Sequence, residues 1–279
     1  MSSERHKLDT NINDSKNTRM DVDAALSQMD VRKDELMHLG RYQKAVQTAI
    51  ALSKQLGKPI RILDLGCGEI YTMRTLYKSF HTKKSDVVQR YIGVDIDDVM
   101  LNRVKNQYSS LLEIINGKLI VKDITVDPKL KVKDNYFDLI VWFEMIEHVK
   151  PEFIPPMFKE LHRVLSPNGT MLVSTPNSRG SNAKIPKDHV YEWDYDELIK
   201  VMERDFDLVC ARGVCINISK IPAEEKTKKA HIIKQVYEAF GENTAFSSTV
   251  LGPVFPPQYC KNVIYTLRKG HYSEGGTKC

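Results

Sequence analysis

Two stretches of the chain contain the residue types that acid–base or metal chemistry needs. The first holds Glu144, Glu147 and His148, spaced to share one face of a helical turn, and the second holds His189. Histidine titrates near neutral pH, so His148 or His189 could remove a proton from an acceptor, with Glu147 beside them as a third catalytic candidate. All four residues together could instead hold a hard or borderline divalent ion. In a third, purely structural interpretation, His148 packs inside and the glutamates face solvent.

Another stretch predicts a strand, a glycine turn and a helix, in that order. Residues 61–64 form a short apolar strand that ends in Asp64, Gly66 and Gly68 follow, and a helical pattern runs over 70–80. The glycines allow a tight turn and leave backbone N–H groups bare at the mouth of a helix, where a ligand can lie against them. This arrangement is half of a nucleotide-binding βαβ unit.

Acidic or aromatic residues follow the next predicted strands. Residues 91–95 end at Asp95, residues 119–123 end at Asp123, and the apolar strand 137–142 runs into Phe143. The alternation of strands and helices predicts a parallel sheet with helices on both faces. Ligands bind outside the carboxyl ends of such strands, so we expect these side chains around one cleft.

In this order, the motifs resemble those of the class I S-adenosylmethionine-dependent methyltransferases. Residues 64–68, Asp-Leu-Gly-Cys-Gly, resemble the motif that accommodates the methionine part of the cofactor. Asp95 matches the acid that binds the ribose, and Asp123 with Ile124 matches the pair beside the adenine. The resemblance covers roughly residues 39–207 and implies S-adenosylmethionine as cofactor. The implied cofactor-binding residues are Tyr42, Asp64, Gly66, Cys67, Gly68, Asp95, Ile96, Asp123, Ile124, Phe143 and Glu144.

The resemblance also implies an α/β fold. We expect a Rossmann-like, seven-stranded, mostly parallel sheet, with helices on both faces and a C-terminal insertion before the last strand. Within the glycine turn, Cys67 occupies a place where only a small side chain fits, and we interpret it as packing. A NAD-dependent dehydrogenase would need a third glycine where Tyr71 stands.

The four residues Glu144, Glu147, His148 and His189 carry a narrower resemblance. Small-RNA 3′-terminal 2′-O-methyltransferases hold magnesium with two Glu and two His, and ubiquinone-pathway O-methyltransferases share the Glu-x-x-Glu-His turn. No basic, aromatic-rich RNA-binding stretch lies beside the motif here. We therefore favour metal-free transfer to an O or N of a small molecule or modified peptide. The alternatives are a metal-dependent RNA 2′-O-methyltransferase and a non-catalytic protein that binds S-adenosylmethionine.

Composition limits the class of protein. The 279 residues are 42% hydrophobic with a net charge of +5, which suits one α/β domain with extensions. None of the five cysteines forms a Cys-x-x-Cys pair, which favours free thiols in a reducing compartment. The polar start and the lack of an apolar run of about 20 residues predict neither a secretory signal nor a membrane helix. We expect a cytoplasmic protein.

The chain is predicted to hold one methyltransferase domain over residues 31–270. A disordered or loosely held arm (1–30) precedes it, and a flexible tail (271–279) follows. Within the domain, an amphipathic helix over 31–57, broken or bent near Gly40, is expected to cover the cofactor. Residues 215–251 form the insertion, with one helix over 223–240, and we expect this segment to lie on the substrate side.

Overall fold

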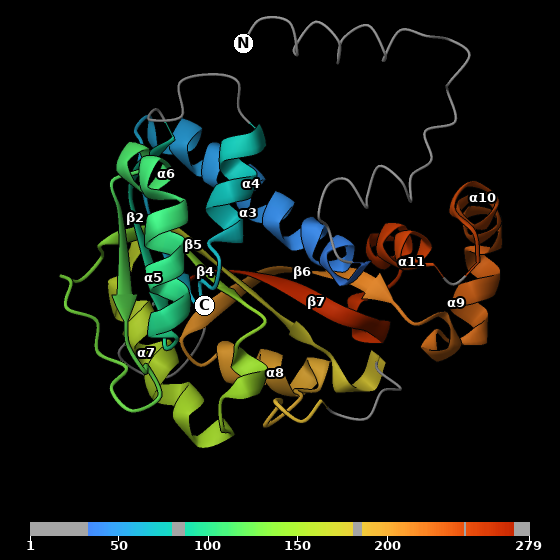
Figure 1. Ribbon diagram of the computed structural model, residues 1–279. Helices are drawn as coiled ribbons and strands as arrows, with labels where there is room; N and C mark the ends of the chain where they lie inside the picture. The colour runs from blue at the N-terminus through green and yellow to red at the C-terminus, as the bar shows by residue number, and fades with distance from the viewer. Residues whose placement is uncertain (1–32, 80–86, 181–185, 243, 271–279) are drawn as a thin grey trace, which may run out of the picture.

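The computed structural model contains one seven-stranded sheet in the order β3-β2-β1-β4-β5-β7-β6 (Figure 1). It describes residues 33–79, 87–180, 186–242 and 244–270, and of residues 33–39 the backbone only. Strands β1 to β5 run parallel, and β7 runs antiparallel to both β5 and β6. The predicted seven-stranded, mostly parallel sheet is therefore confirmed. The strands are β1 (Ile60–Leu65), β2 (Val88–Asp95), β3 (Gly117–Val121), β4 (Phe137–Phe143), β5 (Leu165–Pro176), β6 (Phe206–Ile216) and β7 (Cys260–Lys269).

The register brings the carboxyl ends of the central strands to one edge. Leu65 of β1 pairs with Val94 of β2 and Trp142 of β4, and Asp95 pairs with Val121 of β3. Every residue of β4 is buried, as expected for a central strand covered on both faces. The strand order reverses between β1 and β4, which is where an open α/β sheet binds ligands.

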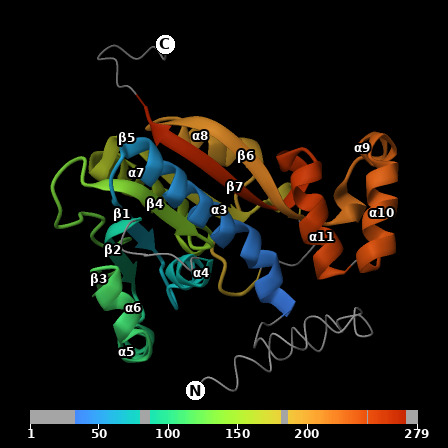
Figure 2. The ribbon, with the colours of Figure 1, turned by 90° about the horizontal axis from the view of Figure 1, so that it is seen from above.

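Helices cover both faces of the sheet (Figure 2). One face packs against α3 (Lys33–Leu56), α4 (Tyr71–Ser79), α5 (Asp98–Gln107) and α6 (Ser109–Ile114), and the other against α7 (Ile154–Val164) and α8 (Tyr195–Met202). Asp97 caps α5 by accepting a hydrogen bond from Met100 N, and Asp194 caps α8 by accepting one from Asp196 N.

Helix α3 runs through Gly40 without interruption, so the expected break there is wrong. A single glycine inside a helix costs about 1 kcal/mol. Burial of Ala45, Val46, Ala49 and Leu52 against the sheet outweighs that cost.

The insertion holds three helices where one was predicted. They are α9 (Ala223–Lys228), α10 (Ala230–Phe240) and α11 (Ala245–Leu251). Lys229 leaves the helical conformation and divides the predicted helix in two. Helix α11 packs against α3 and β6, and Phe240 stacks on Phe246 with ring centroids 6.0 Å apart. The insertion thus extends the domain beyond the end of β6 (Figure 2).

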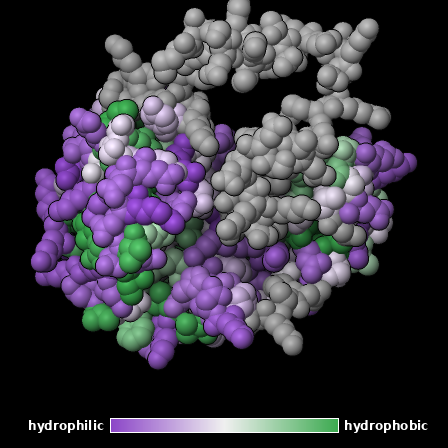
Figure 3. All heavy atoms as spheres, in the orientation of Figure 1, coloured by the Kyte–Doolittle hydropathy of each residue, from purple (hydrophilic) through white to green (hydrophobic). Residues whose placement is uncertain are grey.

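The predicted arm and tail, and parts of the loops around 81–89 and 178–187, lie outside the described residues. Hydrophilic side chains cover most of the described surface seen in Figure 3, with apolar ones in scattered groups. Cys67, Cys210, Cys215 and Cys260 are free thiols. No helix in the described ranges is long and apolar enough to cross a lipid bilayer.

Candidate functional site

A cavity of about 440 Å³ opens at the carboxyl edge of the sheet, between the turn after β1 and the turn after β4. His148 lines it, together with Lys122, Thr125 and Met145, which the sequence did not single out. Six of the predicted cofactor-binding residues also line it, namely Gly66, Asp95, Ile96, Asp123, Ile124 and Glu144. The remaining five, Tyr42, Asp64, Cys67, Gly68 and Phe143, lie outside its lining.

The glycine turn depends on backbone angles that favour glycine. Gly66 has φ 63° and Gly68 has φ 49°. A Cβ atom at Gly66 would lie 2.9 Å from Met145 Cγ, so the turns after β1 and β4 touch at this point. The N–H of Gly68 donates to Asp95 Oδ2 at 2.9 Å, which fixes the acid beside the turn.

Two acids at successive strand ends face the cavity. Asp95 also accepts from Asp97 N at 3.1 Å, yet each carboxylate oxygen has two lone pairs and can accept further hydrogen bonds. Asp123 accepts from the hydroxyl of Thr125 at 2.6 Å and from its N–H at 2.8 Å. The Thr125 hydroxyl contact is the main cause that lowers the pKa of Asp123, so this carboxylate is ionised near neutral pH.

Asp64 and Cys67 are buried beside the cavity. Asp64 is 4% exposed, and its Oδ2 accepts from the Tyr91 hydroxyl at 3.0 Å. Burial raises the pKa of Asp64 to about 7. Burial likewise raises the pKa of the Cys67 thiol, in keeping with a packing role. Direct contact of either residue with the cofactor stays a prediction.

Tyr42 reaches from α3 to the glycine turn. Its ring stacks on Tyr71 with centroids 5.6 Å apart and lies 6.2 Å from the ring of Phe143. Helix α3 therefore lies over both the glycine turn and the end of β4. A contact of Tyr42 or Phe143 with bound cofactor stays a prediction.

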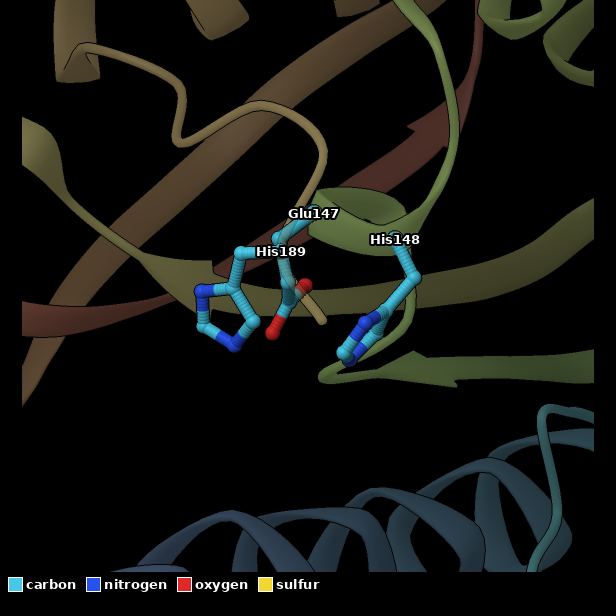
Figure 4. A group of neighbouring side chains, drawn as sticks. All are labelled: Glu147, His148 and His189. Carbon is cyan, nitrogen blue, oxygen red and sulfur yellow. The ribbon is translucent and has the colours of Figure 1, made fainter. Parts of the chain in front are cut away.

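Glu147, His148 and His189 form one group of side chains (Figure 4). Each can offer a ligand atom, and these atoms lie within 4.8 Å of one another. The two imidazole rings are 4.9 Å apart and nearly perpendicular, at 89°. The carbonyl of Glu147 accepts from Val190 N at 2.8 Å and Tyr191 N at 3.0 Å, which ties the loop bearing His189 to the turn η2 (Ile146–His148).

Contacts at Nδ1 orient both imidazoles. His148 Nδ1 lies 2.7 Å from the carbonyl oxygen of Asp188, and His189 Nδ1 lies 2.9 Å from Glu192 Oε1. A carbonyl oxygen only accepts, so the proton of neutral His148 sits on Nδ1, and the carboxylate favours the same tautomer for His189. Each Nε2 then keeps a free lone pair, as a general base or a metal ligand requires.

Glu147 is 1% exposed, and its Oε2 accepts from the Thr175 hydroxyl at 3.0 Å. Burial raises the pKa of Glu147, because the charged form loses its hydration. A cation in this group, either a protonated imidazole or a metal ion, would favour the ionised form.

Glu144 does not join this group. Its carboxylate lies 2.8 Å from Arg41 Nη1 and accepts from Ser174 Oγ at 2.9 Å and Asn262 Nδ2 at 2.8 Å. Its backbone has φ 48°, and the helical turn begins only at Ile146. The expected shared face of Glu144, Glu147 and His148 is therefore wrong, because the left-handed residue redirects the chain.

Sequence reasoning also missed Glu192, Thr175 and Asn262. Glu192 stands three positions after His189, and that spacing was an available signal of an orienting carboxylate. Thr175 and Asn262 gave no such signal, because they reach the site from β5 and β7.

Comparison with known proteins agrees with this geometry. Residues 37–198 match the family model described as "Methyltransferase domain". A Mycolicibacterium smegmatis protein named "Probable S-adenosylmethionine-dependent methyltransferase" is 31% identical over 148 residues, which is 51% of this chain and 49% of that protein. A small RNA 2′-O-methyltransferase of Tetrahymena thermophila is 25% identical over 159 residues, 49% of this chain and 35% of that protein. The matches thus span about half or less of these relatives.

The fold recurs among solved structures. The cyclase SpnF has a TM-score of 0.52 and 16% identity, with 81% of each chain covered. This likeness concerns the fold alone, since one fold supports several chemistries. The family model covers more than half of the chain, and the cavity lies where the motifs predict it. The chain belongs to the methyltransferase domain family, within the class I S-adenosylmethionine-dependent methyltransferases.

Proposed function

We propose that this protein transfers the methyl group of S-adenosylmethionine to an oxygen or nitrogen of a small molecule or modified peptide. One observation carries the proposal. His148 lines the cavity that holds Asp95 and Asp123, and it also belongs to the group formed with Glu147 and His189. A proton acceptor therefore stands at the wall of the proposed cofactor site.

Two acids bind the cofactor in this proposal, and the group with the histidines acts on the acceptor. Asp95 accepts from the ribose hydroxyls, and Asp123 accepts from the adenine amine. Methyl transfer from a sulfonium is an in-line displacement, so the protein must align the acceptor and remove its proton. The side chain of His148 is 37% exposed at the wall of the cavity, and its Nε2 has a free lone pair. His148 therefore serves as the base. His189 and Glu147 orient the acceptor beside it.

The test combines binding with turnover. S-adenosylmethionine is titrated into the protein by calorimetry, and release of S-adenosylhomocysteine is then followed with panels of alcohols, phenols, amines, peptides and short RNAs. We expect binding without an acceptor and turnover with one panel, which His148→Gln abolishes. Absence of binding would overturn the proposal, and binding with no turnover on any panel would support the non-catalytic alternative.

A second candidate is a metal-dependent RNA 2′-O-methyltransferase. Glu147, His148 and His189 fit a divalent ion, because both histidines have a free Nε2 and a partner at Nδ1. A bound ion would lower the pKa of an acceptor hydroxyl. The relative from Tetrahymena is named as a small RNA 2′-O-methyltransferase. We favour the metal-free case, because Glu144, the fourth residue of that resemblance, is held elsewhere.

EDTA separates the two candidates. If the histidines act as a base, turnover survives the chelator. If Glu147, His148 and His189 hold an ion, turnover stops with EDTA and returns with added Mg²⁺, Mn²⁺ or Zn²⁺.

A further inference from the structure

Arg41 is a buried cation at the centre of the molecule. It projects from α3 with 1% of its surface exposed, and its Nη1 lies 2.8 Å from Glu144 Oε1. The contact of Nη1 with Glu144 is an ion pair without hydrogen-bond alignment, and among the described residues Nε has no hydrogen-bond partner. Burial lowers the pKa of Arg41 to about 10, so the guanidinium stays charged at neutral pH. A buried charge with incomplete hydrogen bonding is unfavourable for stability, and such a residue needs an explanation beyond packing.

The partner of Arg41 joins four elements of the fold. Glu144 follows β4, and its carboxylate meets Arg41 of α3, Ser174 of β5 and Asn262 of β7. Ser174 and Asn262 are themselves buried, at 0% and 7% exposure. Their donors approach both carboxylate oxygens, so Glu144 has little freedom to move.

Glu144 also sets the path of the chain into η2, the turn that carries Glu147 and His148. Its φ of 48° is a left-handed conformation that costs a non-glycine residue about 1 kcal/mol. Its N–H donates to Ser174 O at 2.9 Å, and the chain then passes through Met145 into the η2 turn. The side-chain contacts of Glu144 stabilise this bend, and Glu147 and His148 leave the bend in a fixed direction.

Tyr42, the residue after Arg41, attaches α3 to the side of the site where the cofactor is expected. Tyr42 stacks on Tyr71, which follows the glycine turn. Two consecutive residues of α3 therefore contact two parts of the site. Arg41 contacts Glu144, which precedes η2, and Tyr42 contacts Tyr71 beside the glycine turn.

We infer that Arg41 is a positioning residue which, through Glu144, holds the η2 turn so that His148 faces the cofactor cavity with Glu147 beside it. The inference rests on the proposed function only in its last step, that this placement serves methyl transfer. The placement itself can be measured without an acceptor.

The measurement is NMR of ring-labelled histidine in the full chain. His148→Gln and His189→Gln assign the two resonances by their loss. Arg41→Met should then shift both, and Arg41→Lys, which keeps a cation for Glu144, should restore them in large part. The matched control is Arg61→Met, because Arg61 Nε lies 3.2 Å from the buried Asp138 at the opposite end of β4. Arg61→Met should leave both resonances in place.

Two results would overturn the inference: histidine resonances unchanged in Arg41→Met, or shifted as far by Arg61→Met. If Arg41→Met does not fold, Asn262→Ser removes a donor from the other side of Glu144 and should shift the same two resonances. If the wild-type protein fails to bind S-adenosylmethionine, the proposed function is refuted. The NMR test of how Arg41 positions the histidines remains valid in that case. With an identified acceptor, Arg41→Met should lower kcat and leave the KM for S-adenosylmethionine near its wild-type value, as expected for a displaced base, and Arg41→Lys should recover most of the lost kcat.

Discussion

Replacing Asp95 with alanine removes a carboxylate that holds the glycine turn and lines the cavity. The variant loses the acceptors that we propose for the ribose hydroxyls and also the acceptor for Gly68 N–H. A hydrogen bond to a charged group contributes about 1.5–3 kcal/mol. We therefore expect affinity for S-adenosylmethionine to fall by roughly 10- to 150-fold. The loosened glycine turn should place the loss towards the upper end of this range.

Calorimetry with S-adenosylmethionine measures this loss, and Asp97→Ala is the matched control. Asp97 lies two residues further along and carries the same charge, but its carboxylate accepts from Met100 N at 2.8 Å and caps α5. Loss of a cap lowers stability by about 1 kcal/mol. This loss concerns the stability of the fold. In Asp97→Ala, affinity for S-adenosylmethionine should stay within about twofold of the wild type, whereas a tenfold loss would need a change of about 1.4 kcal/mol in the binding free energy.

Asp95→Asn keeps one side-chain oxygen and should bind with intermediate affinity. The reasoning fails if Asp95→Ala binds S-adenosylmethionine as tightly as the wild type. It also fails if Asp97→Ala weakens binding equally, because the effect would then come from net charge at this edge of the sheet.

Three further predictions concern the glycine turn, a buried acid and the insertion. Gly66→Ala should lower the free energy of unfolding by about 1–3 kcal/mol, and Gly68→Ala by only about 1 kcal/mol, because a Cβ atom meets Met145 at Gly66 and nothing within 4 Å at Gly68. Equal losses in urea denaturation would contradict the contact with Met145. The folded pKa of Asp64 lies near 7, above its ordinary 3.8, so the folded state keeps a proton that the unfolded state loses, and stability falls as pH rises between these values. Asp64→Asn should remove this dependence and, at pH 8, should be more stable than the wild type by at most roughly 4 kcal/mol. If the pH dependence of stability is unchanged in this variant, Asp64 is ionised in the folded state. Deleting α9 and α10 while keeping α11 should preserve binding of S-adenosylmethionine and abolish transfer, and equal loss of both in a folded variant would refute a substrate-side insertion.

The glycine turn and the strand ends around the cavity could be predicted from sequence because their signals are local. A strand, two glycines and a helix occupy one short window, and the acids at Asp95 and Asp123 stand directly at strand ends. Parallel strands then bring these windows to one edge, whatever the loops between them do. The same reasoning misjudged a helix end. Lys229 divides a helix whose apolar pattern continues across it. It also gave no sign that Asp64 accepts a hydrogen bond from the buried Tyr91.

Residue types alone suggested a group of four side chains, and the structure gathers three of them. Glu144, Glu147, His148 and His189 have the right chemistry, and a regular helical turn would have gathered the first three on one face. The left-handed φ of Glu144 breaks that turn, and a glutamate rarely adopts it without support. The support comes from Arg41 and Asn262, which are far from Glu144 in the sequence, so no local window contains it. Glu144 thereby fixes the bend, and Glu147, His148 and His189 remain as the candidates to act on an acceptor.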